Sequence, residues 1–416
     1  MTFASLGLSD PLLRALVELG YRLPTPVQLA AIPAIMRGRD LWASAQTGSG
    51  KTAAFVLPIL ERLSTTAPSE RGAVQALILV PTRELAVQTG QAIARYGRKL
   101  PVPLTTCVAV GGVAIERQLR RLADGVQLLV ATPGRLLDLI DQNAVQLSSL
   151  QTLVLDEADR LLSLGFAEQL AALLALLPSD SQRLLFSATF PPKVVALAEK
   201  LLREPCSINI DAGATPAADV IEQRVIEVDA GQRTALLQHL LRVHAWPQLL
   251  VFVASRLAAD ELALTLSRAG TQAWPLHGEL GQDARTQTLT DFKAGRFQVL
   301  VATDLAARGL DIVQLPAVLN FDLPRSAADY THRIGRTGRA GETGVALSFV
   351  SAATAAHFRL IEKRHRIALE REQIPGFEPS ELALAGQDEN GGIKGKRKSK
   401  KDKLREALAR ATSNRS

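Results

Sequence analysis

Short runs of apolar residues alternate with longer segments of helical periodicity along most of the chain. Each run is continuous rather than alternating, as in Leu153–Leu155 and Leu249–Val253. Strands of a parallel sheet covered by helices on both faces have this composition. The pattern predicts two α/β units, with strands at 40–44, 76–80, 106–110, 128–131, 153–155 and 184–186 in the first, and at 220–228, 249–253, 299–302, 317–321 and 345–350 in the second.

The two units are separated by small and polar residues at 211–219, a composition typical of a linker. The tetrapeptide Leu-Val-Ala-Thr occurs at 129–132 and again at 300–303, which hints at a duplicated architecture. A chain of 416 residues has room for two or three domains of about 150 residues. We expect an N-terminal region at 1–30, a first domain at 31–206, a linker at 207–219, a second domain at 220–370 and a disordered basic tail at 371–416.

Positive charge is concentrated at the C-terminal end. Between Gly391 and Ser416, ten Lys and Arg residues stand against two acidic residues, while the whole chain carries a net charge of +7. The tail therefore accounts for the net charge. A disordered polycation of this kind binds nucleic acid without reading its sequence, and a solubilising chain end is the alternative interpretation.

The composition favours a globular protein of the cytoplasm. Hydrophobic residues make up 47% of the chain, enough for a buried core in each unit. The start of the chain lacks the basic and apolar regions of a secretion signal, and the longest apolar run, Leu170–Leu177, is too short to span a membrane. Cys107 and Cys206 have no metal-ligand spacing and fit a reducing compartment.

A glycine-containing turn between a predicted strand and a predicted helix has the pattern of a phosphate-binding loop. The strand is Asp40–Ser44 and the helix begins at Ala53–Leu57. In such a loop the backbone N–H groups hold a polyphosphate, a Lys reaches the terminal phosphates and a hydroxyl binds Mg²⁺. An alanine stands where the strict pattern has its first glycine. The residues are Ala45, Gln46, Thr47, Gly48, Ser49, Gly50, Lys51 and Thr52.

Two adjacent carboxylates supply what such a loop lacks. Asp156 and Glu157 follow the apolar run Leu153–Leu155. Together with Thr52, Asp156 is a candidate ligand for Mg²⁺, and Glu157 is positioned to orient or deprotonate an attacking water. An acidic helix N-terminus is the alternative, because carboxylates favour the helix dipole there.

The second unit has no phosphate loop but carries regularly spaced arginines in the segment His332–Arg339. Guanidinium groups suit a γ-phosphate because they donate several hydrogen bonds from a planar fork. If both units close on one nucleotide, Arg336 and Arg339 act as arginine fingers. A basic patch that faces nucleic acid is the alternative interpretation.

A rigid turn near the N-terminus offers an adenine contact. Pro24 and Pro26 flank Thr25 ahead of Gln28. An amide side chain can bond the N6 and N7 edge of adenine, and Tyr21 offers a ring for stacking. Residues that merely begin a helix are the alternative.

In their order, these segments resemble the motifs of DEAD-box RNA helicases, and the short chain with a basic tail is most similar to the bacterial RhlE-type subgroup. The family uses Ala at the first loop position, in agreement with Ala45. One departure is Ser255, where the family usually has Thr. The resemblance covers about residues 3 to 368 through segments at 20–28, 45–52, 81–86, 111–112, 132–135, 156–159, 187–189, 251–256, 277–285, 302–311 and 332–341.

The resemblance implies two RecA-like domains, ATP and Mg²⁺ in the cleft between them, and RNA across both domains. It implies adenine recognition by Gln28 and places Gly309 and Asp311 near the nucleotide. It also implies that Asp159, Ser187, Thr189 and His332 couple RNA to hydrolysis. The residues implied for RNA binding are Arg83, Gly112, Thr132, Arg135, Gln282, Arg285 and Thr303.

A low aromatic content of 4% limits base stacking, so we expect RNA binding to follow the backbone and to be largely independent of sequence. We expect a monomeric core that hydrolyses ATP, strains a short RNA duplex and releases a strand. An ATP-gated RNA clamp with little unwinding is a second hypothesis, and a DNA-translocating helicase is a third.

Overall fold

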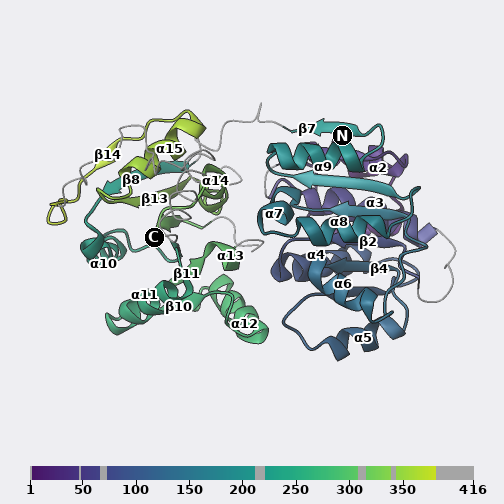
Figure 1. The fold of residues 1–416 in the computed structure, drawn as a ribbon, viewed down its shortest axis with the longest axis horizontal. Helices are drawn as coiled ribbons and strands as arrows, with labels where there is room; N and C mark the ends of the chain where they lie inside the picture. Colours follow the sequence, from purple (N-terminus) through teal and green to yellow (C-terminus); the bar gives the residue numbers. More distant parts are fainter. Residues whose placement is uncertain are drawn as a thin grey trace, which may run out of the picture.

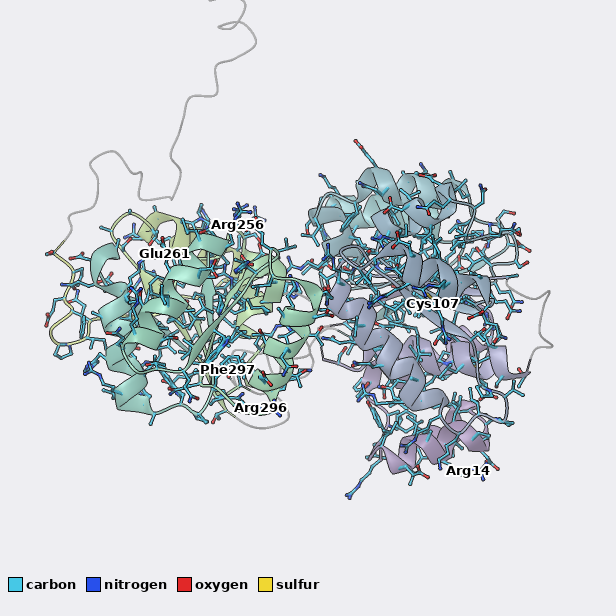
Figure 2. The ribbon with its side chains drawn as sticks, turned by 90° about the horizontal axis from the view of Figure 1, so that it is seen from below. Arg14, Cys107, Arg256, Glu261, Arg296 and Phe297 are labelled. Atoms are coloured by element: carbon cyan, nitrogen blue, oxygen red, sulfur yellow. The ribbon has the colours of Figure 1, made fainter. Side chains whose placement is uncertain are left out.

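The structure, a computed structural model, describes residues 2–45, 48–65, 73–210, 221–307, 315–338 and 343–380. Two seven-stranded sheets organise these residues, and Figures 1 and 2 show them as two bodies side by side. All strand pairs within both sheets are parallel. The predicted fold class, two α/β domains with parallel sheets, is confirmed.

The first domain begins with a short 3-10 helix and two α-helices that precede the sheet: η1 (Phe3–Leu6), α1 (Asp10–Glu18) and α2 (Pro26–Met36). Its strands are β1 (Leu41–Ser44), β2 (Ala76–Leu79), β3 (Thr106–Ala109), β4 (Leu128–Ala131), β5 (Thr152–Leu155), β6 (Gln182–Ser187) and β7 (Cys206–Asn209). The helices between the strands are α3 (Lys51–Thr65), α4 (Arg83–Gly97), α5 (Ile115–Ala123), α6 (Pro133–Asp141), α7 (Ala158–Ser163), α8 (Ala167–Ala175) and α9 (Pro192–Leu201).

The second domain repeats this alternation. Its strands are β8 (Ile221–Glu227), β9 (Leu249–Val253), β10 (Ala273–Leu276), β11 (Val299–Thr303), β12 (Ala317–Asn320), β13 (Gly344–Val350) and β14 (Arg371–Glu372). Its helices are η3 (Ala230–Gln232), α10 (Arg233–His244), α11 (Arg256–Arg268), α12 (Gln282–Lys293), α13 (Asp304–Ala307), α14 (Ala327–Ile334) and α15 (Ala355–His365).

The strand order is the same in both domains. The first sheet has the order β3-β4-β2-β5-β6-β1-β7 and the second the order β10-β11-β9-β12-β13-β8-β14. Counted from the first strand of each domain, these two orders are identical. The repeated Leu-Val-Ala-Thr segments fall on the equivalent strands β4 and β11. The final Thr directly follows β4 in the first domain and is the last residue of β11 in the second. The duplicated architecture is therefore present in the fold.

Helices bury both faces of each sheet. In the first domain α2, α3 and α4 pack on one face and α6, α8 and α9 on the other. In the second domain α10 and α11 cover one face and α12 to α15 the other. The central strands are fully buried for this reason, as the continuous burial of β2, β4, β5 and β9 shows. In a doubly covered parallel sheet, the edge at the carboxyl ends of the strands is where ligands bind.

Three strands were not predicted, and each lies at a sheet edge. They are β7, β10 and β14. An edge strand pairs on one side only and does not need a continuous apolar run. Strand β10 even contains Pro275, and β14 consists of the charged residues Arg371 and Glu372.

These edge strands correct two predicted boundaries. Residues 207–209 belong to β7 and not to the linker, of which 211–219 lie outside the described residues. The tail does not begin at 371, because β14 pairs with β8 and Ser380 bonds to the Asp229 carboxylate at 2.8 Å. The basic part of the tail, from 381 onward, lies outside the described residues. No helix among those described is long and apolar enough to cross a membrane.

Candidate functional site

The predicted phosphate loop connects β1 to α3, as its sequence required. Gly48 and Gly50 have φ angles of 79° and 95°, in the left-handed region that favours glycine. Lys51 is the first residue of α3 and is only 6% exposed, and its Nζ has no hydrogen-bond partner among the described residues. A buried ammonium without a partner is costly, so this site fits a polyanion. Gln46 and Thr47 lie outside the described residues.

Gln28 lies directly against this loop. Its amide oxygen accepts a hydrogen bond from the Thr25 backbone at 2.9 Å, and its Nε2 donates to the Gly50 carbonyl at 3.1 Å. A Cβ added at Gly50 would lie 2.4 Å from that nitrogen, so the loop needs glycine there. The ring of Tyr21 packs edge-on against Phe3 and Tyr96, and its hydroxyl lies 3.0 Å from that of Tyr96. The structure thus brings Gln28 into contact with the loop, whereas the contacts described for Tyr21 are with Phe3 and Tyr96.

Asp156 and Glu157 follow β5 at the same edge of the sheet. Burial raises the pKa of Asp156 from its ordinary value of 3.8 to about 6, while nearby Lys51 opposes the rise. A bound cation would favour the carboxylate and lower this pKa. Glu157 has a φ of 50° and a ψ of 53°, a left-handed conformation that is uncommon outside glycine. Strained backbone of this kind concentrates at functional sites.

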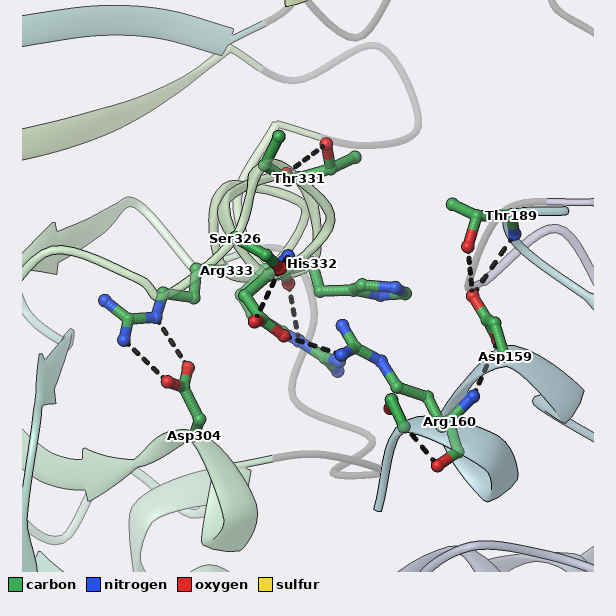
Figure 3. Close-up of polar contacts among 12 residues, drawn as sticks. Asp159, Arg160, Thr189, Asp304, Ser326, Thr331, His332 and Arg333 are labelled. Atoms are coloured by element: carbon green, nitrogen blue, oxygen red, sulfur yellow. Dashed lines mark hydrogen bonds and ion pairs between the residues drawn. The ribbon is translucent and has the colours of Figure 1, made fainter. Parts of the chain in front are cut away.

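A compact hydrogen-bond network joins Asp159 to the end of β6. The Thr189 hydroxyl donates to the Asp159 carboxylate at 2.6 Å, and the Asp159 backbone N–H donates to the Ser187 hydroxyl at 3.2 Å. Ser187 in turn donates to the Thr189 carbonyl at 2.7 Å. Figure 3 shows the Asp159–Thr189 contacts at the side that faces the second domain. The structure therefore brings these three predicted coupling residues together.

The second domain presents α14 and the turn after it to this site. Arg336 is 4% exposed, and its Nε donates to the His332 carbonyl at 3.3 Å. The pKa of His332 is well below its ordinary value of 6.5, because the ring is desolvated and because Arg160, Arg336 and Lys51 are nearby cations. Two of these cations belong to the first domain, so His332 lies close to both halves of the site. Gly309, Asp311 and Arg339 lie outside the described residues.

Four predicted RNA-binding residues of the first domain gather at the carboxyl ends of β2, β3 and β4. A Cβ added at Gly112 would lie 2.0 Å from a guanidinium nitrogen of Arg83, so these two residues are in close contact. Arg135 donates from Nη1 to the Val113 carbonyl at 3.1 Å. Thr132 begins α6 in the same region. Two guanidinium groups and a glycine backbone at one sheet edge suit the phosphates of a nucleic acid.

In the second domain, Gln282 and Thr303 lie at the corresponding edge, at the start of α12 and the end of β11. Arg285 is directed elsewhere. Its Nη2 lies 2.6 Å from Glu84 Oε1 of the first domain, and both side chains are 6% exposed. Its Nη1 donates to the His277 carbonyl at 3.2 Å. This differs from the phosphate contact that the sequence predicted, because the carboxylate of Glu84 already pairs with the guanidinium.

A second ion pair joins the domains near Asp159. Arg160 Nη1 donates to Asp329 Oδ1 at 2.6 Å, with the two side chains 6% and 10% exposed. No pattern in the sequence predicted a role for Arg160, Asp329 or Glu84. Arg160 directly follows Asp159, and Glu84 lies within the segment 81–86. Their position next to or inside predicted motifs was the sequence feature that could have identified them. Their partners lie in the other domain and have no local pattern.

A cavity of about 530 Å³ opens between the domains beside this ion pair. Its walls include Asp159, Thr189 and Pro191 from the first domain and Thr303 and Asp304 from the second. A cavity with walls from both domains depends on their relative position. The coupling network and the end of β11 therefore share one space.

Comparison with known proteins places this geometry in a family. Residues 25–197 match the DEAD/DEAH box helicase family and residues 232–341 match the helicase conserved C-terminal domain. A DEAD-box ATP-dependent RNA helicase CshA of Geobacillus kaustophilus is 40% identical over 391 residues, which cover 93% of this chain and 80% of that protein. The chain belongs to the DEAD-box ATP-dependent RNA helicases. The name of this relative is CshA, so the predicted RhlE-type subgroup is not established.

Solved structures agree with this assignment. The S. cerevisiae protein Dbp5 bound to RNA and ADP BeF3 has a TM-score of 0.79 at 32% identity, with 89% of this chain and 95% of that chain covered. Mss116p bound to ssRNA and AMP-PNP has a TM-score of 0.81 at 29% identity, with 91% and 80% covered. Both alignments extend over both domains. The relative position of the domains in this chain is therefore similar to that in two complexes with RNA and a nucleotide analogue.

Proposed function

We propose that this protein is an RNA-stimulated ATPase that locally unwinds short RNA duplexes or remodels RNA–protein complexes, with its ATP site assembled from both domains. The observation that carries the proposal is the position of His332. Its ring lines a pocket together with Arg160 of the first domain and Arg336 of the second. Its pKa is lowered first by desolvation and then by the cations Arg160, Arg336 and Lys51. Half of the hydrolytic site lies in each domain.

In the proposed site, the first domain binds ATP. Gln28 recognises the adenine edge after its amide leaves the Gly50 carbonyl, and Tyr21 borders the base. The loop Ala45–Thr52 holds the phosphates through backbone N–H groups, and the unpartnered Nζ of Lys51 reaches the terminal phosphates. Gly309 and Asp311 are proposed to contact the nucleotide from the second domain.

Hydrolysis requires charge stabilisation and an oriented water. A bound Mg²⁺, held by the Thr52 hydroxyl and the Asp156 carboxylate, would supply neutralisation of phosphate charge. Glu157, whose backbone is in the left-handed region, orients and deprotonates the water. Arg336 and Arg339 stabilise the charge that develops on the γ-phosphate.

RNA binding is proposed to follow the backbone across the carboxyl edges of both sheets. Arg83, Gly112, Thr132 and Arg135 would contact phosphates in the first domain, and Gln282 and Thr303 in the second. Contacts of this kind are largely independent of sequence and weaken with salt. Contacts with 2′-hydroxyl groups would favour RNA over DNA.

RNA and ATP together are proposed to close the domains, because each ligand touches both of them. Binding to one closed state makes the two ligands cooperative. The Asp159–Ser187–Thr189 network and His332 lie between the two ligand sites and would transmit closure. Strain on a short duplex would release one strand, and hydrolysis would then reopen the enzyme.

The test is a comparison of phosphate release and strand release. We expect single-stranded RNA to raise ATP turnover at least tenfold, with product many times the enzyme concentration, and a short RNA duplex to separate in the presence of ATP. A clamp would bind ATP and RNA together but hydrolyse no more than a few ATP molecules per enzyme molecule. Equal stimulation by DNA of the same sequence would instead support a DNA-translocating helicase.

Finer features are part of the same proposal. We assign a first domain that extends to β7 at residue 209 and a second domain that runs from 221 to 380, each with its own buried core. We also propose that the core is monomeric. The RhlE-type subgroup is supported by the ten Lys and Arg residues between Gly391 and Ser416. Location in the cytoplasm is supported by the two free cysteines Cys107 and Cys206.

A further inference from the structure

We propose that Arg160 is a positioning residue that holds the second domain's α14, and with it Arg336, in register with the Asp156–Glu157 side of the ATP site through its ion pair with Asp329. This inference deepens the proposed function and rests on it. Among the described residues, the side-chain hydrogen bond of Arg160 is to Asp329 of the second domain, so its effect on hydrolysis would pass through that domain.

The contact itself has the geometry of a specific ion pair. Arg160 Nη1 lies 2.6 Å from Asp329 Oδ1, and the Arg160 and Asp329 side chains are 6% and 10% exposed. Figure 3 shows the Arg160 side chain extending from the first domain toward the helix that carries His332 and Arg333. A charge-assisted hydrogen bond at this distance is directional. It therefore specifies the relative position of α7 and α14.

Each partner also has a hydrogen bond inside its own domain. The Arg160 backbone N–H donates to the Asp159 carboxylate at 3.1 Å, which ties Arg160 to the Asp159–Thr189 network. In the second domain, the Ser326 hydroxyl donates to Asp329 Oδ2 at 2.7 Å and accepts from the Asp329 backbone N–H at 3.1 Å. Ser326 begins α14, so the helix cap orients the carboxylate. The Asp329 carboxylate therefore has little side-chain freedom left to lose on pairing.

The helix transmits this position to Arg336. Asp329 lies in the first turn of α14, and Arg336 follows directly after the last turn. Arg336 is bonded to that last turn through its Nε and the His332 carbonyl at 3.3 Å. A displacement of Asp329 therefore moves Arg336 with it. An arginine finger is sensitive to such displacement because catalysis depends on position at the level of about 1 Å.

Removal of one member of the pair leaves the other buried charge without its counter-charge from the opposite domain, which strongly disfavours the closed state. Opening of the domains hydrates both groups and removes that cost. Loss of the pair therefore shifts the equilibrium toward the open state without unfolding either domain. The effect is specific to states in which the domains meet.

A charge-reversal cycle tests the inference. We expect Arg160→Asp and Asp329→Arg each to lower RNA-stimulated kcat about tenfold or more, and the two together to recover kcat to within about threefold of wild type. ATP affinity measured without RNA is expected to change less than twofold. Closure is measured separately by energy transfer between dyes at the exposed positions Val102 and Val243, each changed to Cys in a Cys206→Ser background, with AMP-PNP and RNA.

The matched control is the Arg224–Glu372 pair, which lies within the second domain at 2.7 Å. Arg224→Asp should leave kcat and closure unchanged even where it lowers the melting temperature. Arg160→Gln and Asp329→Asn replace the reversals if circular dichroism shows either reversal to be unfolded. Normal closure and kcat in both single variants would overturn the inference. A double variant whose fold loss in kcat equals the product of the two single fold losses would also overturn it, because the reversed charges would then not rescue each other. Absence of RNA-stimulated turnover in the wild type would overturn the proposed function instead.

Discussion

Arg285 of the second domain and Glu84 of the first form a buried ion pair, with 2.6 Å between Arg285 Nη2 and Glu84 Oε1. The pair lies beside the surface proposed for RNA, yet its guanidinium is already paired with a carboxylate. Its role in RNA binding is therefore open to a direct test by salt dependence. Each phosphate neutralised on a single strand contributes about 0.7 to the slope of log affinity against log salt concentration.

We expect Arg285→Ala to weaken RNA binding in the presence of AMP-PNP without changing that slope, because closure is lost while the number of phosphate contacts is not. Arg135→Ala is the matched comparison and should lower the slope by about 0.7. Fluorescence anisotropy of a labelled single-stranded RNA between 50 and 300 mM salt, as an order-of-magnitude range, measures both. A slope lowered equally by Arg285→Ala would restore the phosphate contact that the sequence predicted.

The fold was largely predictable because both sheets are buried on both faces. Continuous apolar runs predicted every central strand, and the shared Leu-Val-Ala-Thr segments fall on the equivalent strands β4 and β11. The strands β7, β10 and β14 were missed because an edge position does not require an apolar run. A strand of four or fewer residues that pairs on one side only has too few apolar positions for its sequence to predict it.

The site was predictable only within each domain. The phosphate loop and Asp156–Glu157 follow strands directly, and the chemistry of their side chains is visible in the sequence. Glu84 and Arg285 are 201 residues apart in the sequence, and Arg160 and Asp329 are 169 residues apart. Such a pair depends on how two domains meet, and no local periodicity reports that relationship.

Glu157→Gln is expected to retain ATP and RNA binding while RNA-stimulated turnover falls by about 10² to 10⁴, the usual contribution of a general base. Glutamine keeps the size of the side chain but cannot accept the proton of the attacking water. Single-turnover phosphate release, together with equilibrium binding of a fluorescent ATP analogue, separates the two effects. Turnover near that of the wild type would exclude Glu157 from this role.

Arg336→Ala is expected to preserve ATP affinity in the absence of RNA, because the phosphate loop of the first domain supplies most of that binding. RNA-stimulated hydrolysis should fall by about 10³ or more, by comparison with arginine fingers of other nucleotide hydrolases. Arg242→Ala, at an exposed position in the last turn of α10, is the control and should retain full activity. Unchanged hydrolysis in Arg336→Ala would contradict the finger assignment.

Deletion of residues 391–416 removes ten basic and two acidic residues, more positive charge than the whole chain carries in net terms. We expect weaker RNA binding and a flatter salt dependence, since fewer counterions are released on binding. Basal ATP hydrolysis should be unchanged, because the residues proposed for the ATP site all precede 340. Replacement of the same segment by an uncharged linker of equal length separates charge from length. An unchanged salt slope would support the solubilising interpretation.

His332 gives closure a predicted pH dependence. Its pKa lies well below 6.5 in the described arrangement, because of desolvation first and then the cations Arg160, Arg336 and Lys51, with Asp329 opposing them. Two of these cations belong to the first domain, so opening should return the pKa toward its ordinary value. Above about pH 6.5 the ring is neutral in both states and closure is insensitive to pH. As the pH falls below 6.5, only the open state gains a proton, and closure is disfavoured by up to about tenfold per pH unit.

We therefore expect the population of the closed state, measured by energy transfer with AMP-PNP and RNA, to decrease between pH 7.0 and 5.5, values chosen to bracket roughly the ordinary pKa of histidine. His332→Asn should remove this part of the pH dependence, because asparagine keeps a polar group but does not titrate. Protonation of the nucleotide is common to both proteins and cancels in their ratio. Identical pH profiles for the wild type and His332→Asn would show that His332 does not change protonation when the domains close. Protonation of His332 would then play no part in the coupling between RNA binding and hydrolysis.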